Sequence, residues 1–267
     1  MRKVVLITGA SSGIGKAIGE FLHKKGFTVY GTSRNPDKCK NSMFTLLSLD
    51  VNDVVSIDKT IQYIVKNEGQ IDVLINNAGK GITGPLEDTP IIEMKKTFDT
   101  NFFGVMQVCN AVLPQMRKQK NGLIINVTSI AGDMGLPYRG IYSASKAALS
   151  IYTETLRLET KQFNIDVVDV APGDFATNIA AGRYHTPLLE HSAYKKDYSK
   201  VLKQIDDEVD EGLQPIVMAK AVFKVINASK PKPKYRIGTF LQRIAYKIKF
   251  LLPDSLFEKI MIKQYEL

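Results

Sequence analysis

Cysteine is scarce in this sequence of 267 residues. Only Cys39 and Cys109 occur, far apart and without a neighbouring pair of histidines, which excludes a disulfide framework and a zinc site. We therefore expect reduced thiols and a cytoplasmic protein. The three histidines, His23, His185 and His191, are scattered, so no metal is expected.

Long apolar runs are also missing. No stretch of about 18 apolar residues occurs, so no transmembrane helix is predicted. Residues 1–8 lead directly into a strand pattern without the features of a secretion signal. A composition of 44% hydrophobic and 24% charged residues is typical of an ordinary globular protein.

The positive charge is concentrated in one part of the chain. The net charge is +9, and residues 231–267 hold eight Lys/Arg against three acids, a local excess of +5. No nucleic-acid-binding motif accompanies these charges, so no nucleic-acid partner is predicted.

Short apolar runs rich in β-branched residues alternate with segments of helical periodicity. Because strands buried on both faces and joined by helices form parallel sheets, we predict an α/β fold with one doubly wound domain over residues 1–267. The predicted strands are 3–8, 28–33, 44–49, 72–76, 122–128, 165–171 and 235–238, and the clearest predicted helices are 14–25, 54–66, 101–119 and 142–163.

Two segments interrupt the alternation. Residues 174–214 are polar and weakly periodic, and we expect them to cap the carboxyl ends of the strands. A tail begins near Lys230, after which Pro231 and Pro233 follow.

A glycine-rich turn follows the first predicted strand and opens the first helix. Its glycines let the backbone approach a pyrophosphate, which then lies against the helix N-terminus. The alternative is that these glycines only tighten the strand-to-helix turn and bind no ligand. The predicted contacts are Gly9, Ser11, Ser12, Gly13, Ile14 and Gly15.

The second strand ends without the acidic residue that binds the ribose of NAD. Arg34 stands there instead, and its guanidinium suits a 2′-phosphate, with Ser33 or Thr32 as further donors. This favours NADP(H), although Arg34 could simply be a solvated surface charge.

Two further strand ends complete the predicted cofactor site. Asp50 and Val51 are placed to contact the adenine, and Asn77, Ala78 and Gly79 to line the channel for the nicotinamide ribose. A purely structural turn remains possible for Asn76–Gly79.

Tyr142 and Lys146 are four residues apart at the start of a predicted helix, so their side chains share a face. A nearby ammonium lowers the pKa of a phenol, which suits the phenol to general acid–base catalysis. Exposed Tyr/Lys pairs are common on helices, so the neighbouring motifs must decide whether this pair is catalytic. Ser129 at the end of the fifth strand can reach the same carbonyl, and Asn101, which begins a long predicted helix, could anchor a proton-relaying water; a strand-end turn residue and a helix cap are the plainer alternatives.

Together these motifs resemble the short-chain dehydrogenase/reductase family, in its short single-domain branch, over about residues 1–180. The resemblance implies a Rossmann-like sheet of seven strands in the order 3-2-1-4-5-6-7, and catalysis by Asn101, Ser129, Tyr142 and Lys146. It also implies that Lys146 binds the nicotinamide ribose, and that Pro172, Gly173 and Thr177 contact the cofactor where the following segment closes over it. Many members form dimers or tetramers through the helices of Asn101 and Tyr142, so a homo-oligomer is expected.

The expected activity is NADPH-dependent interconversion of a ketone or aldehyde and an alcohol by hydride transfer. The tail residues 240–252 have an apolar stripe interrupted by basic residues, typical of a helix on an anionic membrane surface. The tail also resembles extensions of members that reduce retinoids, steroids or long-chain keto-lipids, which favours a lipid-like substrate. For the substrate, the alternative is a small soluble carbonyl. For the function, the alternatives are an NADP(H)-binding sensor without turnover and an interaction protein that uses the basic tail. For the apolar stripe of the tail, the alternative is packing on the core or on a partner subunit.

Overall fold

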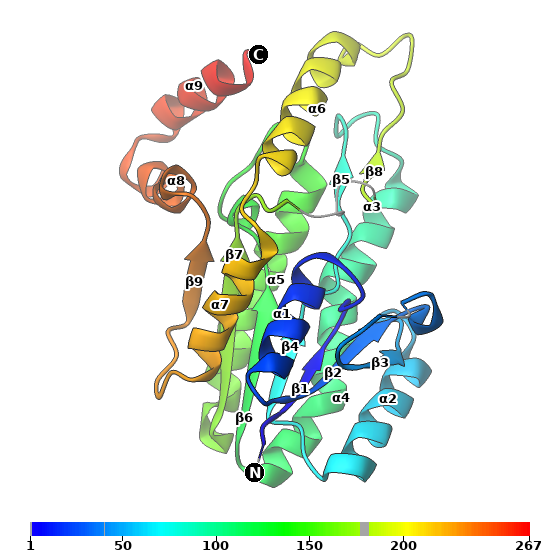
Figure 1. The fold of residues 1–267 in the computed structure, drawn as a ribbon. Coiled ribbons are helices and arrows are strands. Elements are labelled where there is room, and N and C mark those ends of the chain that lie inside the picture. The colour runs from blue at the N-terminus through cyan, green and yellow to red at the C-terminus, as the bar shows by residue number, and fades with distance from the viewer. Residues whose placement is uncertain (1, 40, 177–181) are drawn as a thin grey trace.

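Seven parallel strands form the central sheet, in the order β3-β2-β1-β4-β6-β7-β9 (Figure 1). The computed structural model describes residues 2–39, 41–176 and 182–267, with the backbone alone at 208–210; the predicted cofactor contact Thr177 lies outside the described residues. Numbered within the sheet, this order is 3-2-1-4-5-6-7, which confirms the prediction. The strands are β1 Val4–Ile7, β2 Thr28–Ser33, β3 Thr45–Ser48, β4 Val73–Asn76, β6 Gly122–Val127, β7 Ile165–Pro172 and β9 Lys234–Ile237.

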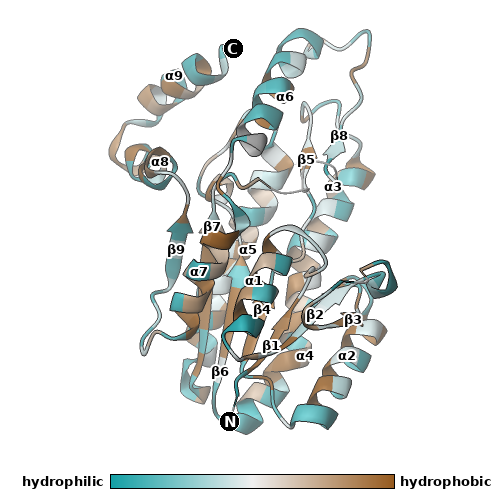
Figure 2. Cartoon of the chain, viewed as in Figure 1, coloured by the Kyte–Doolittle hydropathy of each residue, from teal (hydrophilic) through white to brown (hydrophobic). Residues whose placement is uncertain are grey.

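Helices cover both faces of the sheet (Figures 1 and 2). One face packs against α1 (Gly13–Lys24) and α7 (Pro215–Ile226), and the other against α2 (Val54–Glu68), α4 (Gly104–Gln119) and α5 (Gly140–Thr160). Because both faces are covered, apolar side chains in β1 and β4 are buried whichever way they point, which explains their continuous apolar sequences. Short 3₁₀ turns occur at Pro36–Lys38, Ile130–Asp133 and Lys161–Phe163.

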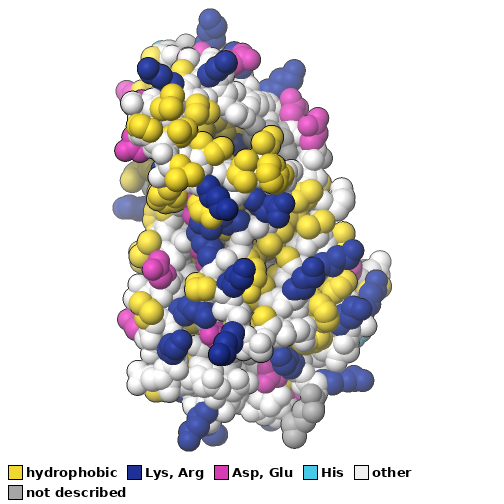
Figure 3. Space-filling model, turned by 90° about the vertical axis from the view of Figure 1, so that its left-hand side faces the viewer, with side chains coloured by type: hydrophobic (Ala, Val, Ile, Leu, Met, Phe, Trp, Pro, Cys, Tyr) yellow, Lys and Arg dark blue, Asp and Glu magenta, His cyan; other side chains and the backbone are white. Residues whose placement is uncertain are grey.

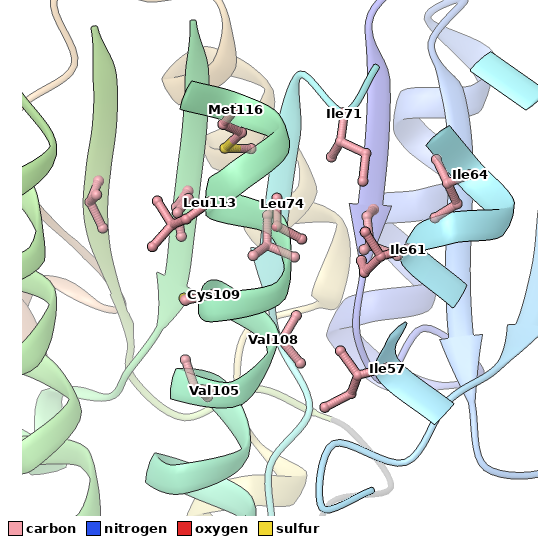
Figure 4. Packing of buried hydrophobic residues seen from close by; sticks show 14 of the residues in the cluster. Ile57, Ile61, Ile64, Ile71, Leu74, Val105, Val108, Cys109, Leu113 and Met116 are labelled. Atoms are coloured by element: carbon pink, nitrogen blue, oxygen red, sulfur yellow. The ribbon is translucent and has the colours of Figure 1, made fainter. Parts of the chain in front are cut away.

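The periodicity of α2 produces one of the two cores. Ile57, Ile61 and Ile64 lie on one face of this helix and point toward α4 and the sheet (Figure 4). They belong to the same buried cluster as Val108 and Cys109, both fully buried. Burial of such a side chain contributes roughly 1.5–3 kcal/mol, so this cluster holds α2 and α4 firmly on the sheet.

The predicted helix 101–119 starts differently from the expectation. Helix α3 (Ile91–Phe98) leads into a π-helical segment, Asp99–Phe103, and α4 follows it. Asn101 therefore lies within a widened turn of a continuing helix and does not cap a helix start. Such π-helical turns are frequent at functional sites because they redirect a side chain.

The segment 174–214, apart from residues 177–181, which lie outside the described residues, contains more regular structure than its weak periodicity indicated. Residues Lys195–Asp210 form helix α6, on which Tyr198, Val201 and Ile205 recur on one buried face. Many polar residues surround this narrow apolar stripe, so the helical periodicity was not apparent in the sequence. Strand β8 (Tyr184–His185) pairs with β5 (Ile82–Thr83) beside α6.

The basic tail forms two helices. The expected amphipathic helix is α8 (Phe240–Leu251), and α9 (Asp254–Tyr265) follows it. Helix α9 lies beside α6 (Figure 1), and its Tyr265 packs with Val201 and Ile205. Within the described ranges, no helix is both long and apolar enough to span a bilayer.

Candidate active site

A cleft of about 520 Å³ lies at the carboxyl ends of the central strands. Ligands of open parallel sheets bind at this edge, where the order of the strands reverses. Fifteen of the predicted residues line the cleft: Gly9, Ser11, Ser12, Gly13, Ile14, Ser33, Arg34, Asp50, Val51, Asn77, Ala78, Gly79, Tyr142, Lys146 and Pro172. Gly15, Asn101, Ser129 and Gly173 are not among the residues that line it.

The glycine turn between β1 and α1 is shaped by close backbone approach. Gly9 has a φ of +65°, and a Cβ there would lie 2.9 Å from the Cα of Ala78. A Cβ on Gly15 would lie 2.4 Å from the carbonyl oxygen of Gly9. Gly15 therefore supports the turn from behind. At the front, the N-cap Ser12 makes no side-chain cap, so the N–H groups at the start of α1 remain available to an anion.

The segment Asn76–Gly79, at and after the end of β4, is hydrogen-bonded to this turn. The hydroxyl of Thr8 accepts hydrogen bonds from the backbone N–H groups of Asn77 and Ala78, both at 3.0 Å. The amide of Asn77 donates to the carbonyl oxygens of Thr8 and Gly9 at 3.1 and 2.9 Å. Asn76 instead donates to Asn126 inside the sheet, so the motif is both structural and part of the cleft wall.

The far end of the cleft carries exposed Arg34 beside Ser33. The hydroxyl of Thr32 is buried there, with no hydrogen-bond partner among the described residues. A hollow of about 280 Å³ adjoins the cleft at Ser11 and is lined by Lys16, Lys38 and Cys39, among others. This end is therefore polar and positively charged, and Asp50 and Val51 lie at its rim.

Lys146 is held in a buried position below the cleft. Its side chain is largely covered, and Nζ donates a 2.9 Å hydrogen bond to the carbonyl oxygen of Val127 and lies 6.0 Å from the ring centre of Tyr142. Burial lowers the pKa of Lys146 to about 8, although the charge of Asp169 opposes this effect. The predicted proximity of phenol and ammonium is therefore present.

The prediction that the pKa of Tyr142 is lowered is wrong for the chain without a bound cofactor. Burial raises this pKa, and it outweighs a hydrogen bond with Ser129 and the charges of Arg139 and Arg183, all of which lower it. Tyr142 is therefore a protonated phenol at neutral pH. That is the state in which it can donate a proton.

Ser129 and Asn101 are each held in place by hydrogen bonds. Ser129 caps the turn Ile130–Asp133 by accepting from the N–H of Ala131 at 3.1 Å, and it also bonds to Tyr142. The amide of Asn101 donates to the carbonyl oxygen of Lys80 at 2.9 Å and to Ser145 at 3.1 Å.

Asn101 and Lys146 also converge on a single point. A Cβ on Gly79 would lie 3.3 Å from Oδ1 of Asn101 and 3.6 Å from Nζ of Lys146. The four predicted catalytic residues are therefore gathered around one end of the cleft.

Sequence reasoning missed the charged residues around the outer side of Tyr142. Arg139 and Arg183 act on its charge, as does Asp174. Arg139 stands three residues before Tyr142, and this spacing places both on one side of a helix start, which was a usable signal. No local signal pointed to Tyr265, whose hydroxyl accepts a 3.2 Å hydrogen bond from Arg139 across 126 positions of sequence.

Known proteins share this architecture. Residues 3–187 match the family described as short chain dehydrogenase. The 3-ketodihydrosphingosine reductase of Bacteroides thetaiotaomicron is 40% identical over 257 residues, which cover 96% of this chain and 95% of that protein. The NADPH-dependent 3-dehydrocapnine reductase of Ornithobacterium rhinotracheale is 31% identical, with 98% and 96% covered. The crystal structure of a short-chain dehydrogenase from Streptomyces avermitilis superposes with a TM-score of 0.85 at 30% identity and covers all of this chain and 97% of that one.

Proposed function

The chain belongs to the short-chain dehydrogenase/reductase family, and on this premise we propose that it uses NADPH to reduce the ketone of a lipid-like molecule to an alcohol. One observation carries this proposal: the cleft joins a cationic, phosphate-compatible end at Arg34 to a protonated phenol at Tyr142. A dinucleotide that lies along this cleft meets both.

The residues of the cleft fit NADP(H). Side chains at Gly9 and Gly15 would collide with the backbone that forms the turn, and the start of α1 offers its N–H groups at that point. Arg34 and the buried hydroxyl of Thr32 stand at the end where a 2′-phosphate would lie. When bound, the cofactor supplies the hydride that reduces the carbonyl carbon. The name of the Ornithobacterium relative also favours NADPH.

Tyr142 donates the proton to the carbonyl oxygen, and Ser129 holds that oxygen beside the phenol. Donors placed where negative charge develops typically contribute 10²–10³-fold to the rate. Lys146, fixed by Val127, supports the phenolate that forms and binds the nicotinamide ribose. Asn101 fixes the backbone at Lys80 and anchors the water that returns a proton to Lys146.

A lipid-like substrate is supported by two observations. The two relatives described above are named as a 3-ketodihydrosphingosine reductase and a 3-dehydrocapnine reductase, and they match 96% and 98% of this chain. In addition, α8 exposes large apolar side chains beside the segment that covers the cleft, with Leu241 and Phe250 each 73% exposed.

We also propose that α8 and α9 rest on an anionic membrane surface. Figure 3 shows hydrophobic side chains and Lys/Arg side chains gathered on the face that carries these helices. Leu251 is 81% exposed, and Arg243 and Lys247 are exposed on the same helix. Such a surface gains free energy both from apolar insertion and from attraction to anionic lipids.

Cosedimentation with liposomes tests the membrane contact. We expect binding to vesicles that contain phosphatidylserine and weak binding to neutral vesicles. The double variant Phe250→Ser/Leu251→Ser should lose binding, whereas Ile91→Ser, at an apolar residue on α3 that is 65% exposed, should retain it. Equal binding by all three proteins would refute this contact.

A homo-oligomer that uses α4 and α5 is proposed as well. Ile151 and Leu158 on α5 are 65% and 72% exposed, which supports a covered apolar face there. Light scattering after gel filtration should give a dimer or tetramer, and Leu158→Glu should shift it toward monomer. A monomeric parent protein would contradict this proposal.

The activity is tested by following NADPH absorbance with long-chain 3-ketones, steroids, retinal and small ketones. We expect turnover of long-chain ketones, and we expect Tyr142→Phe to bind NADPH normally while it loses turnover. Preference for small ketones would remove the lipid assignment. Tight NADPH binding without turnover of any carbonyl would favour a sensor.

A further inference from the structure

The short turn Ile130–Asp133 holds the hydroxyl of Ser129. Ser129 is the N-cap residue of this turn, and its hydroxyl accepts a hydrogen bond from the N–H of Ala131 at 3.1 Å. The turn also packs on α5, because a Cβ on Gly132 would lie 2.9 Å from the backbone carbonyl carbon of Lys146. A shift of the turn therefore moves the hydroxyl that is proposed to meet the carbonyl oxygen.

Ion pairs fix the far end of the turn. Asp133, whose side chain is only 8% exposed, accepts from Nζ of Lys234 at 2.7 Å and from Nε of Arg236 at 2.8 Å. Both cations belong to the edge strand β9, and Lys234 also pairs with Asp169 of β7 at 3.0 Å. Carboxylates and cations balance one another in this partly buried group, so moving one member leaves another with less compensation.

Helix α8 holds Arg236 from the other side. This helix contacts the turn, and the guanidinium carbon of Arg236 lies 3.4 Å from the centre of the Tyr246 ring. A planar guanidinium stacks on an aromatic face, which limits the positions that its side chain can take. One helical turn earlier, Gln242 packs on the end of β7 and leaves no room for a Cβ at Gly173. The start of α8 is therefore fixed to the sheet at two places.

We propose that Asp133, Arg236 and Tyr246 are positioning residues for the ketone reduction. They hold the turn that sets Ser129, and they make turnover depend on the seating of α8. None of the three is among the residues that line the cleft, so their effect on the carbonyl passes through the turn. This inference rests on the proposed function and names residues outside the cleft on which its chemical step depends.

Arg236→Met tests these contacts in the full chain. We expect kcat for a long-chain ketone to fall about tenfold or more, since a small misplacement of a catalytic group is costly. The Kd for NADPH should stay nearly unchanged, because the glycine turn and Arg34 are untouched. Arg157→Met is the matched control, since Arg157 is likewise 20% exposed and donates to the carbonyl oxygens of Val167 and Pro231. It should lower Tm and leave kcat unchanged.

A double-mutant cycle separates positioning from a general loss of structure. In a Ser129→Ala background, Arg236→Met should lower kcat little further, because the hydroxyl that it positions is already gone. Losses that multiply in full would overturn the inference, as would an equal fall of kcat in Arg157→Met.

Two replacements of Tyr246 test the part played by α8. Tyr246→Phe keeps the ring beside Arg236 and should retain kcat, whereas Tyr246→Leu removes the ring and should lower kcat in the same direction as Arg236→Met. Equal kcat values for these two variants would show that the ring does not hold Arg236, and the inference would then fail.

Hydrogen exchange of the turn measures the same link without turnover. The N–H groups of Ala131 and Gly132 are bonded to Ser129, and Arg236→Met should speed their exchange whereas Arg157→Met should not. Unchanged exchange in Arg236→Met would overturn the inference and leave the proposed function intact. If the parent protein reduces no ketone, the proposed function fails, and faster exchange in Arg236→Met then still supports the link between β9 and Ser129.

Discussion

Lys146 donates its 2.9 Å hydrogen bond to the carbonyl oxygen of Val127, at the end of strand β6. The ammonium is thereby tied to the sheet, while the phenol it serves stands on helix α5. The relative position of the two groups depends on how that helix packs on that strand.

The pH dependence of cofactor capture should report Lys146. Its pKa of about 8 lies below the ordinary lysine value because of burial, so the side chain loses its charge as the pH rises through about 8. We expect kcat/KM for NADPH to be level below this pH and to fall above it. Lys146→Arg, which stays charged, should be slower but should remove the inflexion. A profile level to pH 10 in the parent protein would contradict this assignment.

Asp169 should control both stability and this inflexion. It is buried, bonds Thr128 and Ser150, and pairs with Lys234 of β9 at 3.0 Å. Asp169→Asn leaves Lys234 paired with Asp133 alone, and we expect a loss of roughly 1–3 kcal/mol in the free energy of unfolding. Since Asp169 raises the pKa of Lys146, the inflexion should also move to lower pH. Denaturant titration and the pH profile measure the two effects, and an unchanged inflexion would refute the electrostatic link.

Arg34 should decide between the two nicotinamide cofactors. Arg34→Ala removes the cation at the phosphate end of the cleft, so the KM for NADPH should rise by about 10–100-fold while the KM for NADH changes little. Lys59→Ala, at an exposed lysine on α2, serves as the control. Equal effects on both cofactors would show that Arg34 does not contact the 2′-phosphate.

Gly19 should resist replacement even though it lies inside a helix. A Cβ there would lie 2.5 Å from the ring of Phe44, and a Cβ on Gly31 would lie 2.4 Å from the same ring, so the ring is held between two glycines. Overpacking of this kind costs roughly 1–3 kcal/mol, which exceeds the gain of about 1 kcal/mol in helix propensity. Thermal unfolding of Gly19→Ala should show a lower Tm. Gly135→Ala, where a Cβ meets no atom within 4 Å, should leave Tm nearly unchanged.

Features fixed by local periodicity could be predicted from the sequence. The strand 28–33 was predicted with the bounds that β2 has, and the sheet order followed from the resemblance. Tyr142 and Lys146 were placed together by their spacing alone, because four residues make about one helical turn.

Features that depend on distant packing could not be predicted. Arg139 and Tyr265 meet only because α9 folds back along α6. The raised pKa of Tyr142 likewise depends on burial by segments far away in the sequence, which no spacing rule contains. Asn101 was predicted as a site residue and lies close to Gly79, as Lys146 does, but its π-helical setting was not visible in the periodicity.

The two cysteines differ in a way that is useful for spectroscopy. Cys109 is fully buried between α4 and the sheet, and burial raises its pKa to about 12, so its thiol should stay unreactive in the folded protein. Cys39 is partly exposed and lines the hollow beside Ser11, next to the glycine turn. A maleimide fluorophore should therefore label the native chain at one position, and that label would report arrival of the dinucleotide without any engineered residue.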